Sequence, residues 1–197
     1  MRGDLIAFEG LDQSGKQTQA ESLRDYVRGG GRECTLLSFP DYSTPLGHEI
    51  SLALHGKREY AADTLQLLYV ANRYEKRGAM ESLLEAGVTI VCDRYAASSV
   101  AYGEAQGLDP AWLTDAQRFL PRADLTIVLD IAPETAVARK STGRDRYERD
   151  LALLSRVRDS YHRQARQEGW LLLDGARDKA SVSADVIRAA ARLLAPR

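Results

Sequence analysis

The sequence predicts an α/β fold in which helices cover both faces of a five-stranded parallel sheet. Short, mostly apolar runs alternate with longer helical patterns along the 197 residues. Runs of this kind suit strands that are buried on both faces. Their alternation with helices favours parallel pairing through right-handed crossovers. In such a sheet the ligand site is expected at the carboxyl ends of the strands.

The individual elements follow from these patterns in chain order. Strands are expected at Leu5–Phe8, Thr35–Phe39, Val88–Cys92, Leu125–Asp130 and Trp170–Leu173. Helices are expected at Gln19–Val27, from Leu46 to near Gly56, at Ala62–Glu85, from near Ala96, from Pro133, at Leu151–Glu168 and at Ser181–Leu194. Thr44-Pro45 has the residue types of a helix start, and Gly29-Gly30-Gly31 has those of a helix end. We find no repeat, low-complexity tract or linker, so residues 1–197 are expected to form a single domain.

Composition argues against several classes of partner. The net charge is −1, which provides no basic field for nucleic acid or an anionic membrane. No apolar run is long enough for a membrane span, and the N-terminus leads into a strand without the core of a signal peptide. Cys34 and Cys92 fall in predicted buried strands without metal-ligand spacing. We therefore expect a cytoplasmic protein with reduced cysteines and a small-molecule partner.

The chain is organised around the loop between its first strand and its first helix. This loop and the start of the helix consist of Gly10, Leu11, Asp12, Gln13, Ser14, Gly15, Lys16, Gln17 and Thr18. A glycine-bounded loop between strand and helix is the context of a phosphate-binding P-loop. Its amides, the helix N-terminus and Lys16 would form a cradle for nucleotide phosphates. The alternative is an ordinary strand-to-helix turn, which the spacing and the flanks disfavour. The sequence therefore predicts the three-layer fold of P-loop NTPases.

One position departs from the P-loop pattern. The pattern has Ser or Thr directly after the lysine as a magnesium ligand, but this chain has Gln17 there and Thr18 one place later. The carbonyl oxygen of a glutamine can accept a hydrogen bond from a water of the magnesium shell, but it cannot copy a small hydroxyl. The usual magnesium contact is therefore in question, whereas the phosphate site is not.

The strand Val88–Cys92 is followed by a second polar motif, Asp93-Arg94-Tyr95. A carboxylate at the tip of a core strand beside a P-loop can hold magnesium through water, and a neighbouring arginine can bind a phosphate bidentately. Without a P-loop, an exposed ion pair at the strand end would be the preferred interpretation. Ser98, Ser99 and Tyr102 follow at helical spacing and can line one wall of a pocket.

Two further segments have both a structural and a functional interpretation. Tyr69 and Arg73 share a face of the expected helix Ala62–Glu85, and the base rates of burial favour a structural role for the pair. Residues 139–150 hold five cations around Gly143. Such a charge run is usually a solvated loop or helix face. In a P-loop enzyme it can also be a short mobile lid that brings arginines onto the transferring phosphoryl group.

Taken in order, these motifs resemble those of the thymidylate kinases over nearly the whole chain. The resemblance rests on Phe8-Glu9-Gly10-Leu11-Asp12 with Gly15-Lys16, on Phe39-Pro40, on Leu68-Tyr69-Val70-Ala71-Asn72-Arg73, on Asp93-Arg94-Tyr95 and on Arg146-Tyr147-Glu148. It implies phosphoryl transfer from ATP to dTMP with Mg²⁺, which yields dTDP and ADP. It also implies a homodimer packed through helices on one side of the sheet, with Ala62–Glu85 and the helix near Ala96 as candidates.

The resemblance also implies roles for single residues. Lys16 and the loop amides would hold the ATP phosphates, Arg94 would clamp the acceptor phosphate, and Asp93 would orient magnesium-bound water. Asp12 would contact the 3′-hydroxyl of dTMP and the magnesium shell. Tyr69 would stack on thymine, where the family usually has Phe, and Arg73 would hydrogen-bond a base carbonyl. The other acceptor-site residues would be Phe39 and Leu54 as walls, and Ser98, Ser99 and Tyr102 on the sugar side, where Tyr102 would crowd out a ribose 2′-hydroxyl.

The chain departs from the family pattern at further positions. Gln13 stands where many relatives have an arginine in the P-loop, so the missing cation is expected from the lid. Arg144 is the candidate, with Arg146 in the lid fold or the acceptor site. Tyr42 stands where some relatives have an arginine that grips the dTMP phosphate, and a phenol can donate one hydrogen bond there but no charge. The hydroxyl of Tyr69 can alter the preference for dTMP over dUMP.

Two alternatives stay open at this point. One is a kinase of another pyrimidine nucleotide such as dUMP, or of a deoxynucleoside. Arg94 and Tyr42, as candidate contacts of an acceptor phosphate, argue against a bare nucleoside. The other alternative is a nucleotide-binding protein without turnover, which Gln17 keeps open.

Overall fold

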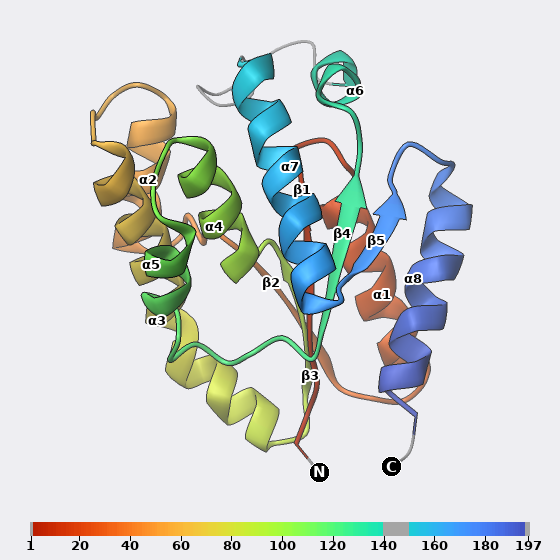
Figure 1. Ribbon diagram of the computed structural model, residues 1–197. Coiled ribbons are helices and arrows are strands. Elements are labelled where there is room, and N and C mark those ends of the chain that lie inside the picture. Colours follow the sequence, from red (N-terminus) through yellow and green to blue (C-terminus); the bar gives the residue numbers. More distant parts are fainter. Residues whose placement is uncertain (1, 140–149, 196–197) are drawn as a thin grey trace.

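The computed structural model describes residues 2–139 and 150–195, and these residues form a five-stranded sheet between layers of helices (Figure 1). The strands are β1 (Leu5–Gly10), β2 (Cys34–Ser38), β3 (Thr89–Asp93), β4 (Leu125–Asp130) and β5 (Leu171–Asp174). Their order across the sheet is β2-β3-β1-β4-β5, and every neighbouring pair is parallel. The predicted α/β class, the parallel pairing and the three layers are confirmed.

Helices cover both faces of this sheet. They are α1 (Lys16–Gly29), α2 (Pro45–Leu54), α3 (Ala62–Glu85), α4 (Ala96–Ala105), α5 (Pro110–Asp115), α6 (Pro133–Arg139), α7 (Leu151–Glu168) and α8 (Lys179–Leu193). Helices α1 and α8 pack against each other on one side, while α4 and α7 pack against each other on the other side (Figure 1). Helices α2, α3 and α5 continue the α4 side toward the β2 edge.

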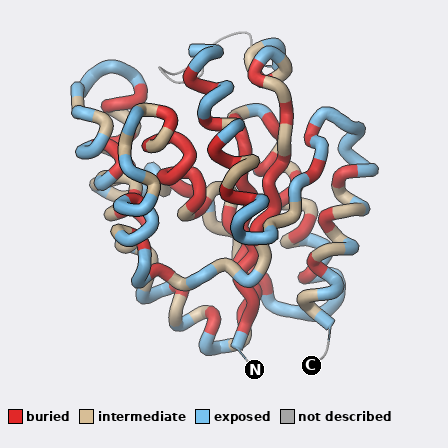
Figure 2. Tube along the Cα trace, in the orientation of Figure 1, coloured by how far each residue is buried: buried red, intermediate tan, exposed pale blue. Residues whose placement is uncertain are grey.

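The sheet divides the hydrophobic interior into two parts. Figure 2 shows that buried residues concentrate on the strands and on the inward faces of the helices. Strand β1 is buried along its whole length, as expected for the central strand of a covered sheet. On α1, Ala20, Leu23 and Val27 recur at helical spacing and pack in the same cluster as Phe8. On the opposite side, α7 contributes Tyr161, which is almost fully buried.

Most of the predicted elements agree with the structure. The strand boundaries differ from the prediction by at most two residues, and α3 and α7 have the predicted bounds. Thr44 caps α2, because its Oγ1 accepts a hydrogen bond from the Gly47 amide at 3.0 Å. Helix α5 was not predicted. It is six residues long and shows no periodic pattern, although Asp109 caps it and Pro110 occupies its first position.

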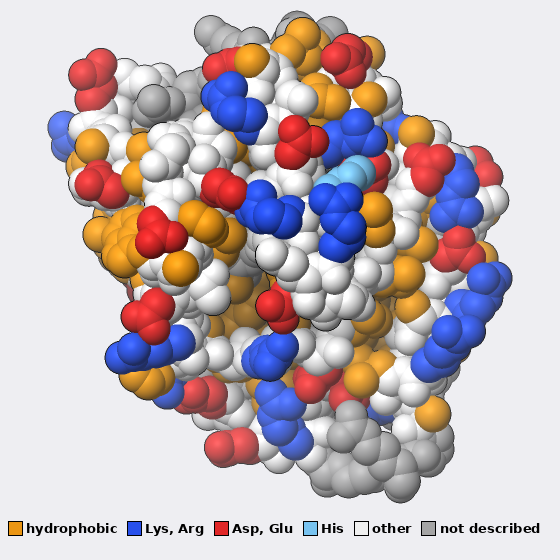
Figure 3. Space-filling view, in the orientation of Figure 1, with side chains coloured by type: hydrophobic (Ala, Val, Ile, Leu, Met, Phe, Trp, Pro, Cys, Tyr) orange, Lys and Arg blue, Asp and Glu red, His pale blue; other side chains and the backbone are white. Residues whose placement is uncertain are grey.

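The surface carries charges of both signs. Figure 3 shows acidic and basic side chains interspersed over one face of the molecule, as the balanced composition predicts. Among the described helices, none has the length and apolar character to cross a membrane. Both cysteines, Cys34 and Cys92, are free and buried in strands, as predicted.

Candidate active site

The P-loop lies at the carboxyl edge of the sheet, between β1 and α1. Gly10 has φ 133° and Gly15 has φ 96°, which L side chains rarely adopt. A Cβ on Gly10 would also lie 2.4 Å from the carbonyl oxygen of Leu129, so only glycine fits there. Gly15 is the N-cap of α1, and no side chain caps this helix. The first amides of α1 are therefore available to an anion.

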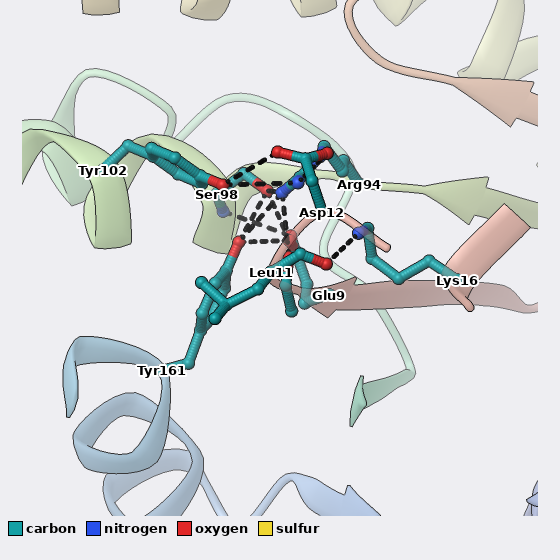
Figure 4. Close-up of polar contacts among 9 residues, drawn as sticks. Glu9, Leu11, Asp12, Lys16, Arg94, Ser98, Tyr102 and Tyr161 are labelled. Carbon is teal, nitrogen blue, oxygen red and sulfur yellow. Dashed lines mark hydrogen bonds and ion pairs between the residues drawn. The ribbon is translucent and has the colours of Figure 1, made fainter. Parts of the chain in front are cut away.

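Lys16 is buried at the start of α1, and its Nζ donates a hydrogen bond to the carbonyl oxygen of Leu11 at 2.7 Å (Figure 4). Burial has the largest effect on its ammonium group, followed by the positive charge of Arg94. The carboxylates of Asp12 and Asp93 oppose these effects without cancelling them. The pKa of Lys16 is thereby lowered from 10.5 to about 8. Phosphate charge beside this ammonium would raise its pKa again.

Arg94 follows β3 and links the P-loop to the helices on the α4 side. Its backbone is left-handed, with φ 64°, and its amide donates to the carbonyl oxygen of Phe8 at 2.9 Å. A non-glycine residue adopts this conformation at a cost of about 1–3 kcal/mol, so the surrounding contacts must hold it there. The guanidinium donates to five groups, which are the Gly10 carbonyl (3.1 Å), Ser98 Oγ (3.1 Å), the Tyr161 hydroxyl (3.3 Å), Asp12 Oδ1 (2.8 Å) and the Tyr102 hydroxyl (3.4 Å).

Asp12 accepts hydrogen bonds from Arg94 and, through Oδ2, from the Tyr102 hydroxyl at 3.2 Å. Burial alone would raise the pKa of this carboxyl. The charges of Arg94 and Lys16 outweigh burial and hold the pKa of Asp12 well below its usual range. Burial also opposes the charge on Arg94, but Asp12 outweighs it and the pKa of Arg94 is raised well above its ordinary value. The pair is therefore ionised at neutral pH.

Glu9 and Tyr161 lie beneath this pair and were not predicted as site residues (Figure 4). Glu9 is fully buried in β1, and its carboxylate accepts from the amides of Tyr95 (2.9 Å) and Ser98 (3.2 Å) and from Ser98 Oγ (2.6 Å). Since Tyr95 provides no side-chain cap for α4, Glu9 caps that helix from the neighbouring strand. The Tyr161 hydroxyl lies 2.9 Å from Ser98 Oγ and 3.3 Å from Glu9 Oε2.

Glu9 and Tyr161 were not predicted as site residues for different reasons. A carboxylate at the end of an otherwise apolar run is a signal that could have identified Glu9. Tyr161 lies on α7, 63 residues after its partner Ser98, and no local pattern in the sequence connects the two.

A cavity of about 490 Å³, open space at its mouth included, adjoins Asp12 and Arg94. All the side chains that the resemblance assigned to the acceptor site line it, namely Asp12, Phe39, Tyr42, Leu54, Tyr69, Arg73, Arg94, Ser98, Ser99 and Tyr102. Pro40 and Gln66 also line it and were not predicted. The structure therefore brings together residues from the P-loop, the loop after β2, and helices α2, α3 and α4.

Arg73 is buried at this cavity although it is a cation. Its Nη1 donates to Ser99 Oγ (2.8 Å), to Gln117 Oε1 (3.1 Å) and to the Tyr69 carbonyl (3.3 Å). Burial lowers the pKa of Arg73, and Glu9 is the charge that opposes this most. The sequence favours a structural role for the pair Tyr69 and Arg73, taken alone. The structure places Arg73 both in the interior and on the cavity wall.

Asp93 and Gln17 bear on the binding of a metal ion. Oδ1 of Asp93 is buried and has no hydrogen-bond partner in the described part of the chain. Gln17 is exposed, and its Nε2 donates to Glu21 Oε1 at 3.0 Å. Residues 2–139 and 150–195 contain no group of three His, Cys, Asp or Glu side chains that could hold a metal. Magnesium often uses one or two carboxylates together with substrate phosphates, so the free oxygen of Asp93 fits this ion.

The predicted lid falls mostly on residues 140–149, which lie outside the described residues, so the positions of Arg144 and Arg146 are not given. Arg139, the last residue of α6, is described and reaches the P-loop. Its Nη1 donates to the Gln13 carbonyl at 3.0 Å, and its Nη2 donates to the Gly175 carbonyl at 3.2 Å. A cation therefore stands beside Gln13. The sequence indicates it only by its place at the start of the predicted lid.

These features define a class of protein. The P-loop holds a buried lysine, and next to it an arginine contacts both this loop and the wall of the neighbouring cavity. This is the arrangement of a P-loop nucleotide kinase, in which donor and acceptor have separate sites.

Comparison with known proteins identifies the family. The family model of thymidylate kinase matches residues 8–186, and the chain belongs to this family. A thymidylate kinase from Arabidopsis thaliana is 42% identical over 160 residues, which cover 81% of this chain and 60% of that protein. One from Plasmodium falciparum is 33% identical over 95% of this chain and 89% of its own length. The solved structure of thymidylate kinase from Candida albicans superposes with a TM-score of 0.83 at 29% identity, covering 98% of this chain and 92% of that one.

Proposed function

We propose that this protein transfers the γ-phosphoryl group of ATP to dTMP and produces dTDP and ADP. The observation that carries the proposal is the position of Arg94. Its guanidinium contacts Gly10 and Asp12 in the P-loop and also Ser98 and Tyr102 on the cavity wall. One cation is thus available to a donor phosphate and to an acceptor phosphate. Membership of the thymidylate kinase family supports dTMP as the acceptor.

The chemistry needs in-line placement and neutralised charge rather than covalent catalysis. Lys16 and the first amides of α1 would bind the phosphates of ATP, and Arg94 would bind the acceptor phosphate and the transferring group. The contacts of Arg94 are already made in the free protein, so its guanidinium needs little reorganisation when substrates arrive. We assign no general base.

The acceptor would occupy the cavity beside Asp12 and Arg94. Asp12 would accept a hydrogen bond from the 3′-hydroxyl, and Tyr102, whose hydroxyl already contacts Asp12, would leave no room for a 2′-hydroxyl. Tyr69 would stack on the base, and Arg73 would donate to a base carbonyl. Phe39, Leu54, Ser98 and Ser99 would complete the walls, with Tyr42 toward solvent.

Asp93 would hold Mg²⁺ through water, and the carbonyl oxygen of Gln17 would be a second contact to the shell of the ion. When bound, the ion would neutralise phosphate charge. The unpartnered Oδ1 of Asp93 supports this placement. The hydrogen bond of Gln17 to Glu21 uses Nε2, so its carbonyl oxygen is the group that would accept a hydrogen bond from the shell of the ion.

We infer further that the chain is a single domain with a short lid at residues 139–150, and that Arg144 supplies the cation that Gln13 does not. We also infer a homodimer packed through α3, which the exposed apolar side chain of Leu67 supports. Helix α4, the other predicted candidate, lacks this support, because all of its residues except Ala96 and Glu104 are buried within the chain. A cytoplasmic location is supported by the two free cysteines, since a reducing compartment keeps thiols unpaired.

The direct test is ADP production from ATP and magnesium with dTMP, dUMP, dCMP and thymidine offered in parallel. Rapid turnover with dTMP alone would support the proposal and show that Gln17 is tolerated. Comparable turnover with dUMP would broaden the substrate to other pyrimidine nucleotides and implicate Tyr69. Measurable ATP binding without turnover of any acceptor would contradict the proposal, and Gln17 would then be the first residue to replace with Ser or Thr.

A further inference from the structure

Gln66 is a buried amide that lines the cavity, and it differs from two other buried amides, Asn72 and Gln117, which do not line it. Asn72 is fully bonded, with its Oδ1 accepting from the Asp41 amide at 2.8 Å and its Nδ2 donating to Thr44 Oγ1 at 2.9 Å. Gln117 accepts from Arg73 and donates to the carbonyl oxygens of Ala96 and Leu113. Gln66 is 1% exposed, yet neither its Nε2 nor its Oε1 has a hydrogen-bond partner in the described part of the chain.

Gln66 is placed where a ligand can reach it. It lies on α3 three residues before Tyr69 and seven before Arg73, so the three side chains share one face of the helix. All three line the cavity. The α4 backbone is close on the other side, because a Cβ on Gly103 would lie 3.4 Å from Cγ of Gln66. Nε of Arg73 is also buried and has no hydrogen-bond partner among the described residues, so two neighbouring groups hold unused hydrogen-bonding capacity.

An unbonded buried amide destabilises the fold, because it has lost its water and gained nothing in return. A methionine would fill the same space on α3 without this penalty. Asn72 and Gln117 show that two other buried amides are satisfied by the protein itself. The presence of glutamine at position 66 is therefore better explained by a hydrogen-bond partner on a bound ligand than by a role in stabilising the fold.

We propose that the carboxamide of Gln66 hydrogen-bonds the polar edge of the pyrimidine base of the acceptor nucleotide. This inference rests on the proposed function. A pyrimidine ring such as thymine has an N–H next to a carbonyl, and a carboxamide matches this pair with one acceptor and one donor. The opposite carbonyl is left to Arg73, which can only donate. Both polar atoms of Gln66 are buried in the free protein, so the amide has to turn toward the cavity to meet the base. Gln66 is then a specificity-determining residue.

The test is Gln66→Met in the full chain, with two ligands and one stability measurement. Binding is measured by calorimetry for dTMP and for an analogue whose base is difluorotoluene, which keeps the shape of thymine but lacks its hydrogen-bonding groups. We expect the Kd of dTMP to rise about 2- to 12-fold and that of the analogue to stay the same. The Tm of the ligand-free protein should rise by about 2–4 °C, because an unbonded amide has been removed.

Gln164→Met is the matched control. Gln164 is a buried amide on α7 that donates to the Ala97 carbonyl and to Ser160 Oγ, and it does not line the cavity. This variant should lower the Tm and leave the Kd of dTMP unchanged.

Several results would overturn the assignment. The proposed hydrogen bond to the base would be contradicted if Gln66→Met left the Kd of dTMP unchanged. It would also be contradicted if the variant weakened the binding of dTMP and of the analogue equally. A Tm that falls as in Gln164→Met, or a variant that does not fold, would show that Gln66 serves the fold. If the wild-type protein does not bind dTMP, the proposed function fails as well, and that result is distinct from the others.

Discussion

Replacement of Arg94 by lysine tests whether the site needs the geometry of a guanidinium or only its charge. Lysine keeps the positive charge but has three donor hydrogens on a single nitrogen, whereas Arg94 donates to five groups. Three of these groups surround Nη1 and two surround Nη2, and a single Nζ can serve only one of the two sets, so at least two contacts are lost in Arg94→Lys. The left-handed backbone at this position is equally unfavourable for both residues, so the comparison isolates the side chain.

The size of the effect follows from these contacts. A hydrogen bond that involves a charged group contributes about 1.5–3 kcal/mol, so two lost contacts amount to about 3–6 kcal/mol. Solvent screens this little, because only 14% of the Arg94 side chain is exposed. If the lost contacts are those that position the guanidinium in the transition state, kcat/KM for dTMP should fall about 10²- to 10⁴-fold.

The assay is ADP release at saturating ATP and magnesium, with dTMP varied. Arg188→Lys is the control, since Arg188 lies exposed on α8 and forms an ion pair with Asp185 on the same helix. This control should keep kcat/KM close to the wild-type value. A value for Arg94→Lys within tenfold of the wild type, in a variant with an unchanged thermal transition, would refute the view that the contacts of Arg94 organise the reaction.

Three further predictions concern Lys16, Tyr102 and the lid. Because the pKa of Lys16 is lowered to about 8, the free protein loses this ammonium as the pH rises through 8, while bound phosphate favours it. We expect kcat/KM for ATP to fall above pH 8 and ATP binding at pH 8 to take up protons, measured by calorimetry in buffers of different ionisation enthalpy; a flat profile to pH 9.5 would contradict this. Tyr102→Ala should relax discrimination against the ribonucleotide acceptor in competition assays, and unchanged discrimination would place that task elsewhere. Arg144→Ala should lower kcat far more than it weakens ATP binding, whereas equal losses would give Arg144 a binding role.

The fold could be predicted from the sequence because its signals are local. Each strand is a short apolar run, α3 has a long periodic pattern with the predicted bounds, and the P-loop is contiguous. Helix α5 escaped prediction for the same reason, since its six residues are too few to show a period. The Asp109-Pro110 start was the only available signal, and it is weak on its own.

The candidate site could be predicted only as far as a family resemblance reaches. Glu9 was not predicted as a site residue, because its partners lie far away in the chain. They are the amides of Tyr95 and Ser98, at a strand-to-helix turn that is 86 residues or more from Glu9. Gln66 could not be predicted as a site residue, because it is distinguished by the lack of a hydrogen bond among the described residues. No sequence pattern reveals such a feature. Long-range contacts of this kind are set by the register of β1 with β3 and by helix packing.

The two ends of the cavity are organised in opposite ways. At the phosphate end, Arg94 and Asp12 hold each other ionised, and Arg94 has contacts on three sides before any substrate binds. At the base end, the amide of Gln66 and Nε of Arg73 are buried and have no hydrogen-bond partners within residues 2–139 and 150–195. Preorganised charge speeds the chemical step but does not distinguish one nucleotide from another. Groups that are satisfied only by the correct base do distinguish them, because a ligand without the matching atoms leaves them unpaired. This division predicts that changes at Arg94 lower turnover for every acceptor, whereas changes at Gln66 alter which acceptor is preferred.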